Sequence, residues 1–491
     1  MGKPKQYIES AKNIILVVLF VTTMLLLYFF WGSPMADSFR ISDIIGEEPS
    51  EIPSYREVTQ PARIDVHFGE GNYTVLEEQD IDAWEKCLQL LRGLDPEGVR
   101  ALEEITAEQF DRIMEFRSIL YRFHYEMPLD TFLKKYELQE IPGANEVGDF
   151  SLIGFSSGSP ESLFIYSRGK DKYYRIVYDQ PHASMEELLS TVEDMVNVSY
   201  FRIGTLVGRD DNRTLVPLDL STSLEEVAYS QEFENLNTAE VKAFAQTFFG
   251  ESFDFVRKIE ESKGTHIYMY GYGEKVLTIT AEGRVEYKNK ETPQGSQQNY
   301  FDALDSALQF VAAHGGWQTG DGMEMSPVVQ YSRAVESEKR KGYRFVFGMQ
   351  LLEEPLYLER SHSIMVEVIH GQVTQYLRDM IEIEEEEFRE QTDGVERQAF
   401  SAINMIAQNY PYIASVLSEK GYDFSSLTGE ALFDAISDLI ISVSTGYMKP
   451  DHGEEGDNVL IPAWIVKTDN VMIYFDLYDA EPLGHTGLLE S

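Results

Sequence analysis

The sequence has little cysteine and few basic residues, and both shortages exclude classes of protein. A single cysteine, Cys87, stands among 491 residues, so neither an intrachain disulfide nor a thiolate metal cluster can form. Lysine and arginine number 41 against 83 aspartates and glutamates, which makes the formal charge −42. Because nucleic-acid phosphates are bound by basic groups, we expect no nucleic-acid partner. Hydrophobic residues still make up 43% of the chain, enough for several folded cores.

Motifs of the common catalytic sites are also scarce. The chain has no P-loop, no glycine-rich dinucleotide-binding motif, no HExxH and no EF-hand loop. The stretch 154–158 fits the G-x-S-x-G pattern of a serine nucleophile, which would make Ser156 catalytic. That motif requires a helix after the serine, whereas the residues that follow favour another strand. We therefore interpret Ser156 as a turn residue.

Histidine and acidic residues show no metal-ligand spacing either. The acidic segment 452–457 could offer oxygen ligands to a cation, but we interpret it as a solvated loop tip. Cys87 falls on the apolar face of a predicted helix with Trp84 and Leu88, which indicates a buried, unreactive thiol. We therefore predict no catalytic, cofactor-binding or metal-binding residue, and we expect that the chain is not an enzyme.

Long hydrophobic runs are missing with one exception near the start of the chain. Residues 14–31 contain no charge, and a helix of this length would extend about 27 Å, close to the roughly 30 Å of a bilayer core. Basic residues precede the run and acidic residues follow it, so we expect a cytoplasmic N-terminus and an extracytoplasmic remainder. A cleaved signal peptide is the alternative, but its apolar region would span only about 7–15 residues. We predict an uncleaved, single-pass anchor in the cell membrane.

We assign ten residues to this membrane anchor. Thr22 and Thr23 are its only polar residues without an aromatic ring. Their hydroxyls can bond either a partner helix or their own backbone carbonyls, and our hypothesis is that they help to dock a partner helix. The anchor residues are Ile14, Leu16, Val18, Phe20, Thr22, Thr23, Leu26, Tyr28, Phe30 and Trp31.

Composition divides the rest of the chain into a linker and three outer domains. Residues 1–32 hold the tail and the anchor, and residues 33–60 are polar, acidic and rich in proline, which is typical of a juxtamembrane linker. An acidic run at 382–387 indicates a later boundary. We predict an α+β fold with antiparallel sheets, in which a transmembrane helix precedes three mixed domains at 61–232, 233–381 and 382–491.

Periodic patterns predict individual elements within these domains. Thr106 and Gln109 have the spacing of a capping box at a helix start. Apolar residues between Ile113 and Phe123 then recur at spacings of three and four, which predicts that the helix continues through them.

Patterns near the C-terminus predict two helices and a hairpin. A helix near 396–409 should stop before Pro411, and a second helix should span 428–443. The segment from Pro462 to Leu477 has the pattern of a closing β-hairpin.

Two internal segments also resemble each other. Residues 277–285 and 365–373 both read as a strand, a glycine turn and a second strand. Duplication is one explanation, and the general similarity of glycine-turn hairpins is the other.

Several features taken together resemble one protein family. They are the lysine-bearing tail with its apolar run ending at Trp31-Gly32, and the segments 200–203, 215–219, 342–348, 355–357, 366–373 and 460–464. With these features, which spread over nearly the whole chain, the sequence resembles the YycH (WalH) family, with the smaller relative YycI as second choice.

The resemblance implies a function and a set of partners. Members of this family are non-enzymatic, extracytoplasmic regulators of the sensor histidine kinase WalK (YycG), whose membrane helices they contact. That kinase acts with WalR (YycF) in a two-component system that controls cell-wall metabolism in Gram-positive bacteria. The implied partners are a WalK/YycG-like kinase, a YycI-like paralogue and the membrane, with no cofactor. Two alternatives stay open: a cell-surface hydrolase or peptidase acting on the wall, and an extracellular ligand-binding or adhesion protein.

Overall fold

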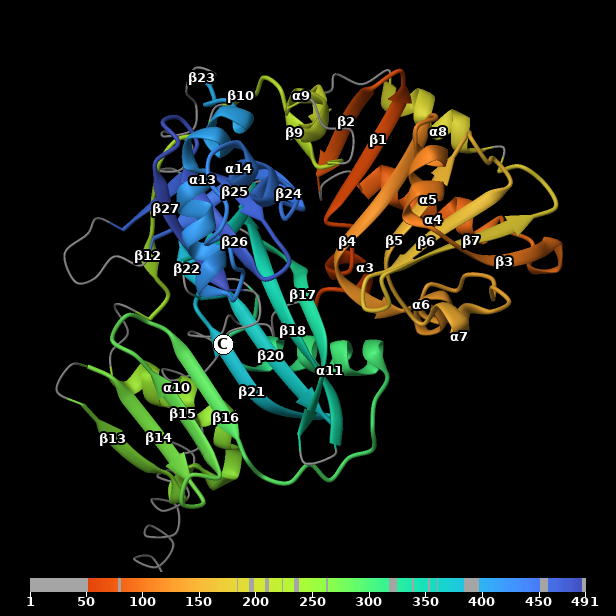
Figure 1. Ribbon diagram of the computed structural model, residues 1–491. Coiled ribbons are helices and arrows are strands. Elements are labelled where there is room, and N and C mark those ends of the chain that lie inside the picture. The colour runs from red at the N-terminus through yellow and green to blue at the C-terminus, as the bar shows by residue number, and fades with distance from the viewer. Residues whose placement is uncertain are drawn as a thin grey trace, which may run out of the picture.

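Apolar strands in the first part of the chain build an antiparallel sheet of nine strands (Figure 1). The strands are β1 (Arg63–Gly69), β2 (Asn72–Glu77), β3 (Val99–Ile105), β4 (Ser118–Pro128), β5 (Asp149–Ser156), β6 (Ser162–Ser167), β7 (Lys172–Tyr178), β8 (Tyr200–Arg202) and β9 (Leu215–Pro217). The computed structural model arranges them in the order β3-β7-β6-β5-β4-β1-β2-β8-β9. The structure describes residues 52–77, 81–182, 184–193, 198–207, 212–222, 224–233, 238–261, 264–317, 325–337, 340–351, 354–359, 361–383, 397–450 and 458–487.

Helices cover both faces of this first sheet because its strands bury apolar residues on both sides. The covering helices are α4 (Ile81–Arg92), α5 (Ala107–Met114) and α8 (Ser184–Glu193). Cys87 of α4 and Leu189 of α8 share one core with Val66 of β1. Phe110 of α5 packs on Leu120 of β4, on the opposite face. The buried position predicted for Cys87 is confirmed.

The start of α5 matches the sequence prediction, but its end does not. Gln109 N–H donates to Thr106 Oγ1 at 3.2 Å, and Thr106 N–H donates to Gln109 Oε1 at 2.9 Å, so the capping box is confirmed. The helix predicted to run on to Phe123 is wrong, because α5 ends at Met114 and Phe123 lies in β4. Phe116, on the supposed buried face, is 57% exposed. Hydrogen bonding of β4 to both β1 and β5 decides its conformation over the apolar spacing.

A helix followed by a four-strand antiparallel meander occurs three times in the rest of the chain. The first unit has α10 (Thr238–Phe249), β13 (Arg257–Glu260), β14 (His266–Tyr270), β15 (Lys275–Ile279) and β16 (Val285–Asn289). The second has α11 (Tyr300–Ala313), β17 (Met325–Ser337), β18 (Arg340–Leu351), β20 (Ile364–Ile369) and β21 (Gln372–Arg378), with β19 (Glu354–Leu358) inserted after β18. The third has α13 (Ala402–Glu419), α14 (Glu430–Ser437), β24 (Ser442–Lys449), β25 (Val459–Lys467), β26 (Val471–Asp476) and β27 (Pro482–Gly487).

The three meanders join into one sheet of fourteen strands. Antiparallel pairing of β16 with β21 sets Tyr287 opposite Tyr376 and connects the first two units. Parallel pairing of β19 with β24 sets Leu356 opposite Tyr447 and connects the third. The predicted α+β class with antiparallel sheets is confirmed, while the limits of the three outer domains stay predictions.

The two segments that resemble each other in sequence are the hairpins β15–β16 and β20–β21. Gly283 and Gly371 in their turns have φ values of 84° and 76°, in the left-handed region that favours glycine. Each hairpin ends a unit that begins with a helix, and the two lie side by side in the sheet. The similarity thus extends from the hairpin to the whole helix-and-meander unit.

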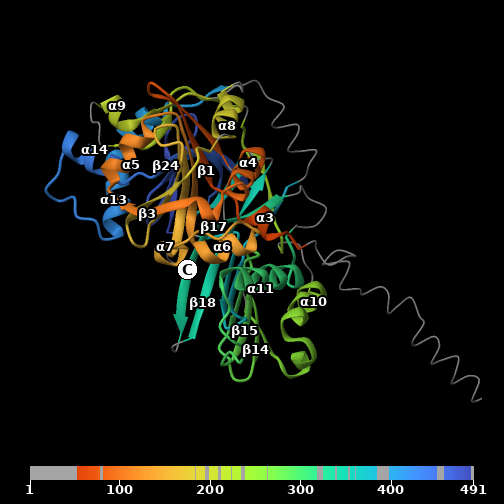
Figure 2. The ribbon, with the colours of Figure 1, turned by 90° about the vertical axis from the view of Figure 1, so that its right-hand side faces the viewer.

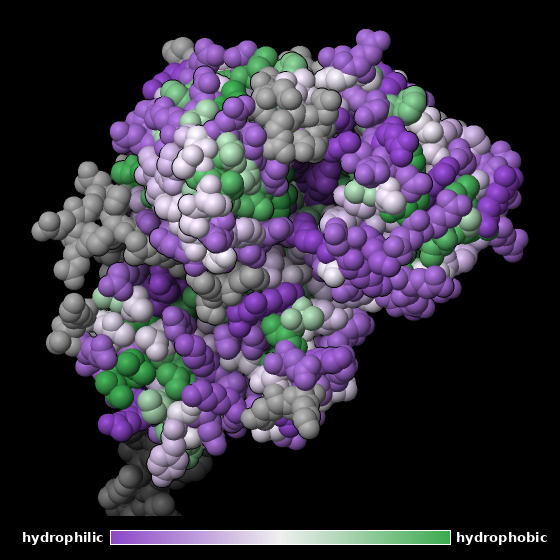
Figure 3. All heavy atoms as spheres, viewed as in Figure 1, coloured by the Kyte–Doolittle hydropathy of each residue, from purple (hydrophilic) through white to green (hydrophobic). Residues whose placement is uncertain are grey.

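Helices α10 and α11 lie on one face of the fourteen-stranded sheet (Figure 2). Phe248 of α10 and Phe310 of α11 pack there against Tyr287 and Tyr376. The face of β13–β15 turned to the viewer in Figure 1 carries apolar side chains among hydrophilic ones (Figure 3). Tyr272, in the turn after β14, is fully exposed.

Two of the predictions for the C-terminal unit need correction. The first helix does not stop before Pro411, because α13 continues to Glu419 with the proline inside it. The buried residues Ile406, Ile413 and Leu417 pack on both sides of the proline, which offsets its missing N–H bond. The second helix is shorter than 428–443, since β24 already begins at Ser442. The closing hairpin is confirmed as β25 and β26.

A buried ion pair joins the segment after the first sheet to the second unit. Arg378, which is fully buried, donates from Nε and Nη2 to the two carboxylate oxygens of Glu232 at 2.7 and 2.5 Å. It also donates to the carbonyl oxygens of Gly315 and Gly316. The same segment contributes β11 (Val227–Ala228), which pairs with β25 in the third unit.

Candidate functional site

The residues predicted to form the membrane anchor, from Ile14 to Trp31, lie outside the described residues. None of the described helices is both long enough and apolar enough to cross a bilayer. The anchor and the threonine pair Thr22 and Thr23 therefore stay predictions.

Ser156 belongs to a strand–turn–strand, so the absence of a helix directly after it is as predicted. It ends β5, and β6 follows after a short turn. Its buried Oγ donates to the carbonyl oxygen of Ile113 at 2.6 Å and accepts from the Gly158 N–H at 3.1 Å. Both bonds tie the hydroxyl to backbone groups, so the G-x-S-x-G pattern here stabilises a turn.

A metal site would require several histidine, cysteine or acidic side chains close together. Among the described residues, no group of three or more histidine, cysteine, aspartate or glutamate side chains could hold a metal ion. The acidic segment 452–457 lies outside the described residues. Burial raises the pKa of the Cys87 thiol well above its usual value, which keeps this group protonated.

A joint of three segments lies where the described chain begins, and we take it as the candidate functional site. The helix α3 (Tyr55–Val58) is within the predicted linker, so a contact made at the predicted anchor would reach the folded part through it. Ser54 and Glu57 form a capping box, with N–H donations of 3.4 Å to Ser54 Oγ and 2.7 Å to Glu57 Oε2. Because a single helical turn is unstable alone, contacts with other segments must hold it.

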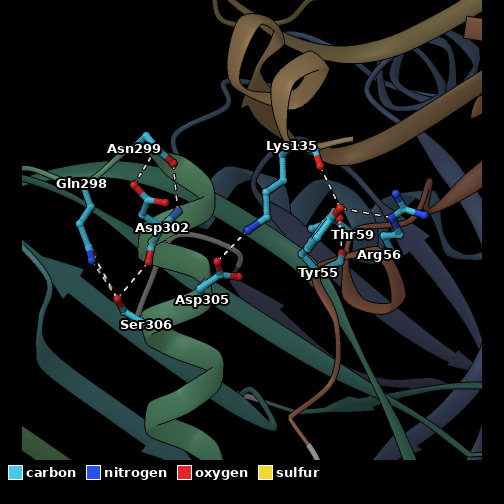
Figure 4. Close-up of polar contacts among 9 residues, drawn as sticks. All are labelled: Tyr55, Arg56, Thr59, Lys135, Gln298, Asn299, Asp302, Asp305 and Ser306. Carbon is cyan, nitrogen blue, oxygen red and sulfur yellow. Dashed lines mark hydrogen bonds and ion pairs between the residues drawn. The ribbon is translucent and has the colours of Figure 1, made fainter. Parts of the chain in front are cut away.

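Tyr55 attaches α3 to two other helices (Figure 4). Its hydroxyl donates to the carbonyl oxygen of Lys135, the last residue of α6 (Leu129–Lys135), at 2.8 Å. Its ring packs edge-to-face on Tyr136, with 5.2 Å between ring centroids, and on Phe301 of α11, with 5.9 Å. One side chain therefore contacts both the first sheet's α6 segment and the second meander unit.

The end of α3 is buried against Tyr136, the residue that follows α6. Thr59 is fully buried, and the Tyr136 hydroxyl donates to its carbonyl oxygen at 3.0 Å. The Tyr136 hydroxyl also lies 2.6 Å from Thr59 Oγ1. Burial raises the pKa of Tyr136 well above its usual value, so the phenol stays neutral and remains a hydrogen-bond donor.

Lys135 completes the connection to α11. Its Nζ lies 2.7 Å from Asp305 Oδ2 and 4.6 Å from the centroid of the Tyr55 ring. The two charged side chains are 26% and 38% exposed, so the ion pair contributes about 1 kcal/mol or less. Asn299 caps α11 by accepting from the Asp302 N–H at 3.0 Å, which fixes the helix end that presents Asp305 (Figure 4).

The joint is held by hydrogen bonds, ring packing and one ion pair, which together fasten α3 to α6 and α11. The composition of residues 33–60 predicts a linker, and nothing in that pattern indicates the joint that the structure shows there. The capping-box spacing of Ser54 and Glu57 was the one signal that could have located α3. The partners of Tyr55 lie far along the chain, where local patterns carry no information about them.

The fold has a counterpart among solved structures. The crystal structure of YycH from Bacillus subtilis matches with a TM-score of 0.52 and covers 85% of this chain and 96% of that chain. The chain has a YycH-like fold. Sequence identity is 14%, so the likeness to YycH is one of fold, and it confirms the resemblance predicted from the sequence at that level.

Other comparisons add little to the likeness with YycH. The YpeB C-terminal domain of Bacillus megaterium aligns with 52% of this chain and 99% of its own length, at 11% identity. Its TM-score of 0.26 is too low to carry an argument. No family model matches the sequence, and no curated protein matches it significantly.

Proposed function

We propose that this protein is a membrane-anchored, extracytoplasmic regulator of a WalK/YycG-like sensor histidine kinase that controls cell-wall metabolism. Residues 14–31 hold it in the membrane, and the folded part lies outside the cell. It acts by contacts with the kinase and with a YycI-like paralogue, and it makes or breaks no covalent bond.

The YycH-like fold is the observation that carries this proposal, because it extends over 85% of the chain. The uncharged run 14–31 supports a membrane position through its length and its flanking charges. The joint at Tyr55 supports coupling, since it fastens the segment that follows the predicted anchor to two parts of the fold. A wall hydrolase has less support, because the Ser156 hydroxyl is engaged by backbone groups in a turn.

Co-purification with the kinase tests the proposal. The full chain, carrying a C-terminal affinity tag, is expressed with the WalK/YycG-like kinase of the same organism and captured from detergent-solubilised membranes. We expect the kinase in the eluate, and we expect less of it when residues 1–32 are replaced by the anchor of an unrelated single-pass protein. The anchor swap keeps the protein at the membrane, so it separates specific helix contacts from mere co-localisation. Absence of the kinase from both eluates would contradict the proposal.

Kinase activity provides a second, independent readout. Autophosphorylation of the kinase is measured in nanodiscs with and without the full chain. We expect the rate to change, with the anchor-swapped chain producing a smaller change. An unchanged rate at saturating protein would contradict regulation even if the two proteins bind.

The threonine pair in the anchor tests the helix-docking hypothesis separately. Replacing Thr22 and Thr23 together with leucine keeps the run apolar and removes both hydroxyls. Because such a hydrogen bond in a membrane is worth about 1 kcal/mol or less, we expect a loss of up to roughly tenfold in co-purified kinase. Replacement of Met24 and Leu25 with valine, which changes the opposite face of the predicted helix, serves as the matched control. Equal recovery from both variants would assign the hydroxyls to their own helix.

A further inference from the structure

A cleft lined by arginine side chains opens on the first sheet, on the face that α5 covers. Its volume is about 50 Å³, and its walls come from β1, β2, β4, β8, α5 and the residues before β9. We call it the arginine cleft. Its charged lining residues are Asp65, Asp111, Arg122, Arg202 and Arg213.

Positive charge exceeds negative charge in this cleft, although the whole chain carries −42. Asp65 forms ion pairs with both Arg122 and Arg63, the latter at 2.6 Å. Asp111 forms an ion pair with Arg213 at 2.8 Å. Arg202 has no carboxylate partner within the part of the chain that the structure describes, and its guanidinium lies over an aromatic ring instead.

The next carboxylate beyond the lining is that of Glu115, which is exposed and acts on Asp111 and Arg213 through its charge. Counting Glu115 and Arg63 with the lining residues, four guanidinium groups face three carboxylates. Counted over the described residues, the cleft is therefore one negative charge short of balance.

A rigid aromatic support holds Arg202 in place. Its guanidinium carbon lies 4.9 Å from the centroid of the Tyr73 ring, and Tyr73 stacks on His67 with 4.1 Å between centroids. His67 Nδ1 donates to the carbonyl oxygen of Met114 at 3.0 Å, while its Nε2 accepts from the Gly71 N–H at 3.3 Å. These two bonds require the neutral tautomer, so the support adds no charge of its own. Arg202 is thus preorganised, and among the described residues it forms no direct ion pair, although its charge acts on Asp111.

Arg213 is partly buried and lines the cleft together with Arg202. Burial lowers the pKa of Arg213, the charge of Asp111 opposes this effect, and the charge of Arg202 adds to it. An anion between Arg202 and Arg213 would offset the repulsion between these two groups, since arginine forks match a pair of oxygen atoms.

We propose that the arginine cleft binds one monovalent oxyanion group, a carboxylate or a phosphodiester, between Arg202 and Arg213. The volume of about 50 Å³ holds about four water molecules, which is the size of one such group and too small for a whole metabolite. The bound group is therefore a small free anion or the acidic end of a larger molecule. This proposal does not depend on the proposed function in kinase regulation.

Titration of the full chain with two probes tests the proposal. Sodium acetate and sodium dimethyl phosphate are added at constant ionic strength, balanced with sodium chloride, and binding is followed by calorimetry and by the shift in melting temperature. We expect saturable binding of at least one probe and a rise in melting temperature. Acetate binding alone would identify a carboxylate site, and dimethyl phosphate binding alone a phosphodiester site. No saturable signal with either probe would overturn the proposal.

Three variants locate the binding. Arg202→Gln removes the unbalanced guanidinium and leaves no carboxylate without a partner, so we expect affinity to fall roughly tenfold to a hundredfold. Arg202→Lys keeps the charge but loses the fork, and we expect an intermediate loss. Arg112→Gln on the exposed side of α5 is the matched control and should bind like the wild type. Equal affinity in all four proteins would overturn the proposal, and the lysine variant keeps the test valid if the glutamine variant misfolds.

Discussion

Replacing Tyr55 with alanine should release α3 from the folded part without unfolding the rest. The change removes the 2.8 Å hydrogen bond to the Lys135 carbonyl, worth about 1 kcal/mol. It also removes edge-to-face packing on Tyr136 and Phe301, each worth about 0.5–1.5 kcal/mol. The contact of the Lys135 ammonium with the ring adds about 0.5 kcal/mol at this partly exposed position. Together these contacts raise the free energy of detaching α3 from the folded part by about 3 kcal/mol. This corresponds to roughly a hundredfold decrease in the equilibrium constant for opening of α3.

Native-state hydrogen exchange of the full chain measures this opening directly. The hydrogen-bonded amides of residues 57–59 should exchange roughly a hundredfold faster in Tyr55→Ala, because opening of α3 becomes easier by that factor. Tyr55→Phe keeps both ring contacts and loses only the hydroxyl, so we expect about a fivefold change. Tyr272→Ala is the matched control, since that tyrosine is fully exposed in a turn.

Two results would refute the reasoning about the joint. Unchanged exchange at residues 57–59 would mean that Tyr55 does not hold α3. Faster exchange spread evenly over α11 and the third meander unit would mean that the contacts support the whole fold rather than a local joint. If regulation passes through the joint, Tyr55→Ala should also weaken the effect on kinase autophosphorylation while co-purification with the kinase persists.

Three further predictions concern buried polar groups elsewhere in the fold. Arg378→Met leaves the Glu232 carboxylate without its partner and should lower the unfolding free energy in urea by about 3–5 kcal/mol, and a loss below about 1 kcal/mol would contradict this. Burial, with a smaller contribution from Arg344, lowers the pKa of His362 to about 4. The unfolded chain therefore binds the proton first, and stability should fall between about pH 6.5 and pH 4 by up to about 3 kcal/mol, a slope that His362→Gln should reduce in pH-dependent melting. Ser156→Ala removes two hydrogen bonds to backbone groups and should lower the unfolding free energy by about 1–2 kcal/mol in urea titrations, whereas an unchanged midpoint would show that the turn does not need them.

Local patterns predicted those elements whose bonds lie close together in the chain. The capping box of Thr106 and Gln109 joins residues three positions apart, so the two residue types and their spacing are enough to locate it. The same holds for the glycine turns at Gly283 and Gly371, where the left-handed backbone favours glycine. The α+β class followed from many such local signals read together.

Patterns failed where a distant partner decides the conformation. The apolar spacing up to Phe123 suits a helix, but pairing of β4 with strands on both sides makes the segment a strand. Pro411 should end a helix, yet the apolar core around α13 keeps the helix continuous. The candidate site could not be predicted for the same reason: the Ser54–Glu57 spacing is local, but the partners of Tyr55 lie far along the chain.

By itself, the sequence determined the acidic charge of this protein, its single cysteine, its one long uncharged run and most of its hairpins, because composition and short-range hydrogen bonding are properties of neighbouring residues. Only the tertiary structure decided that three meanders share one sheet, that α3 is held between α6 and α11, and that three arginines line one small cleft. These features depend on contacts between residues tens to hundreds of positions apart. Closing such long loops costs conformational entropy, so these contacts form only when folding buries enough apolar surface to offset that cost.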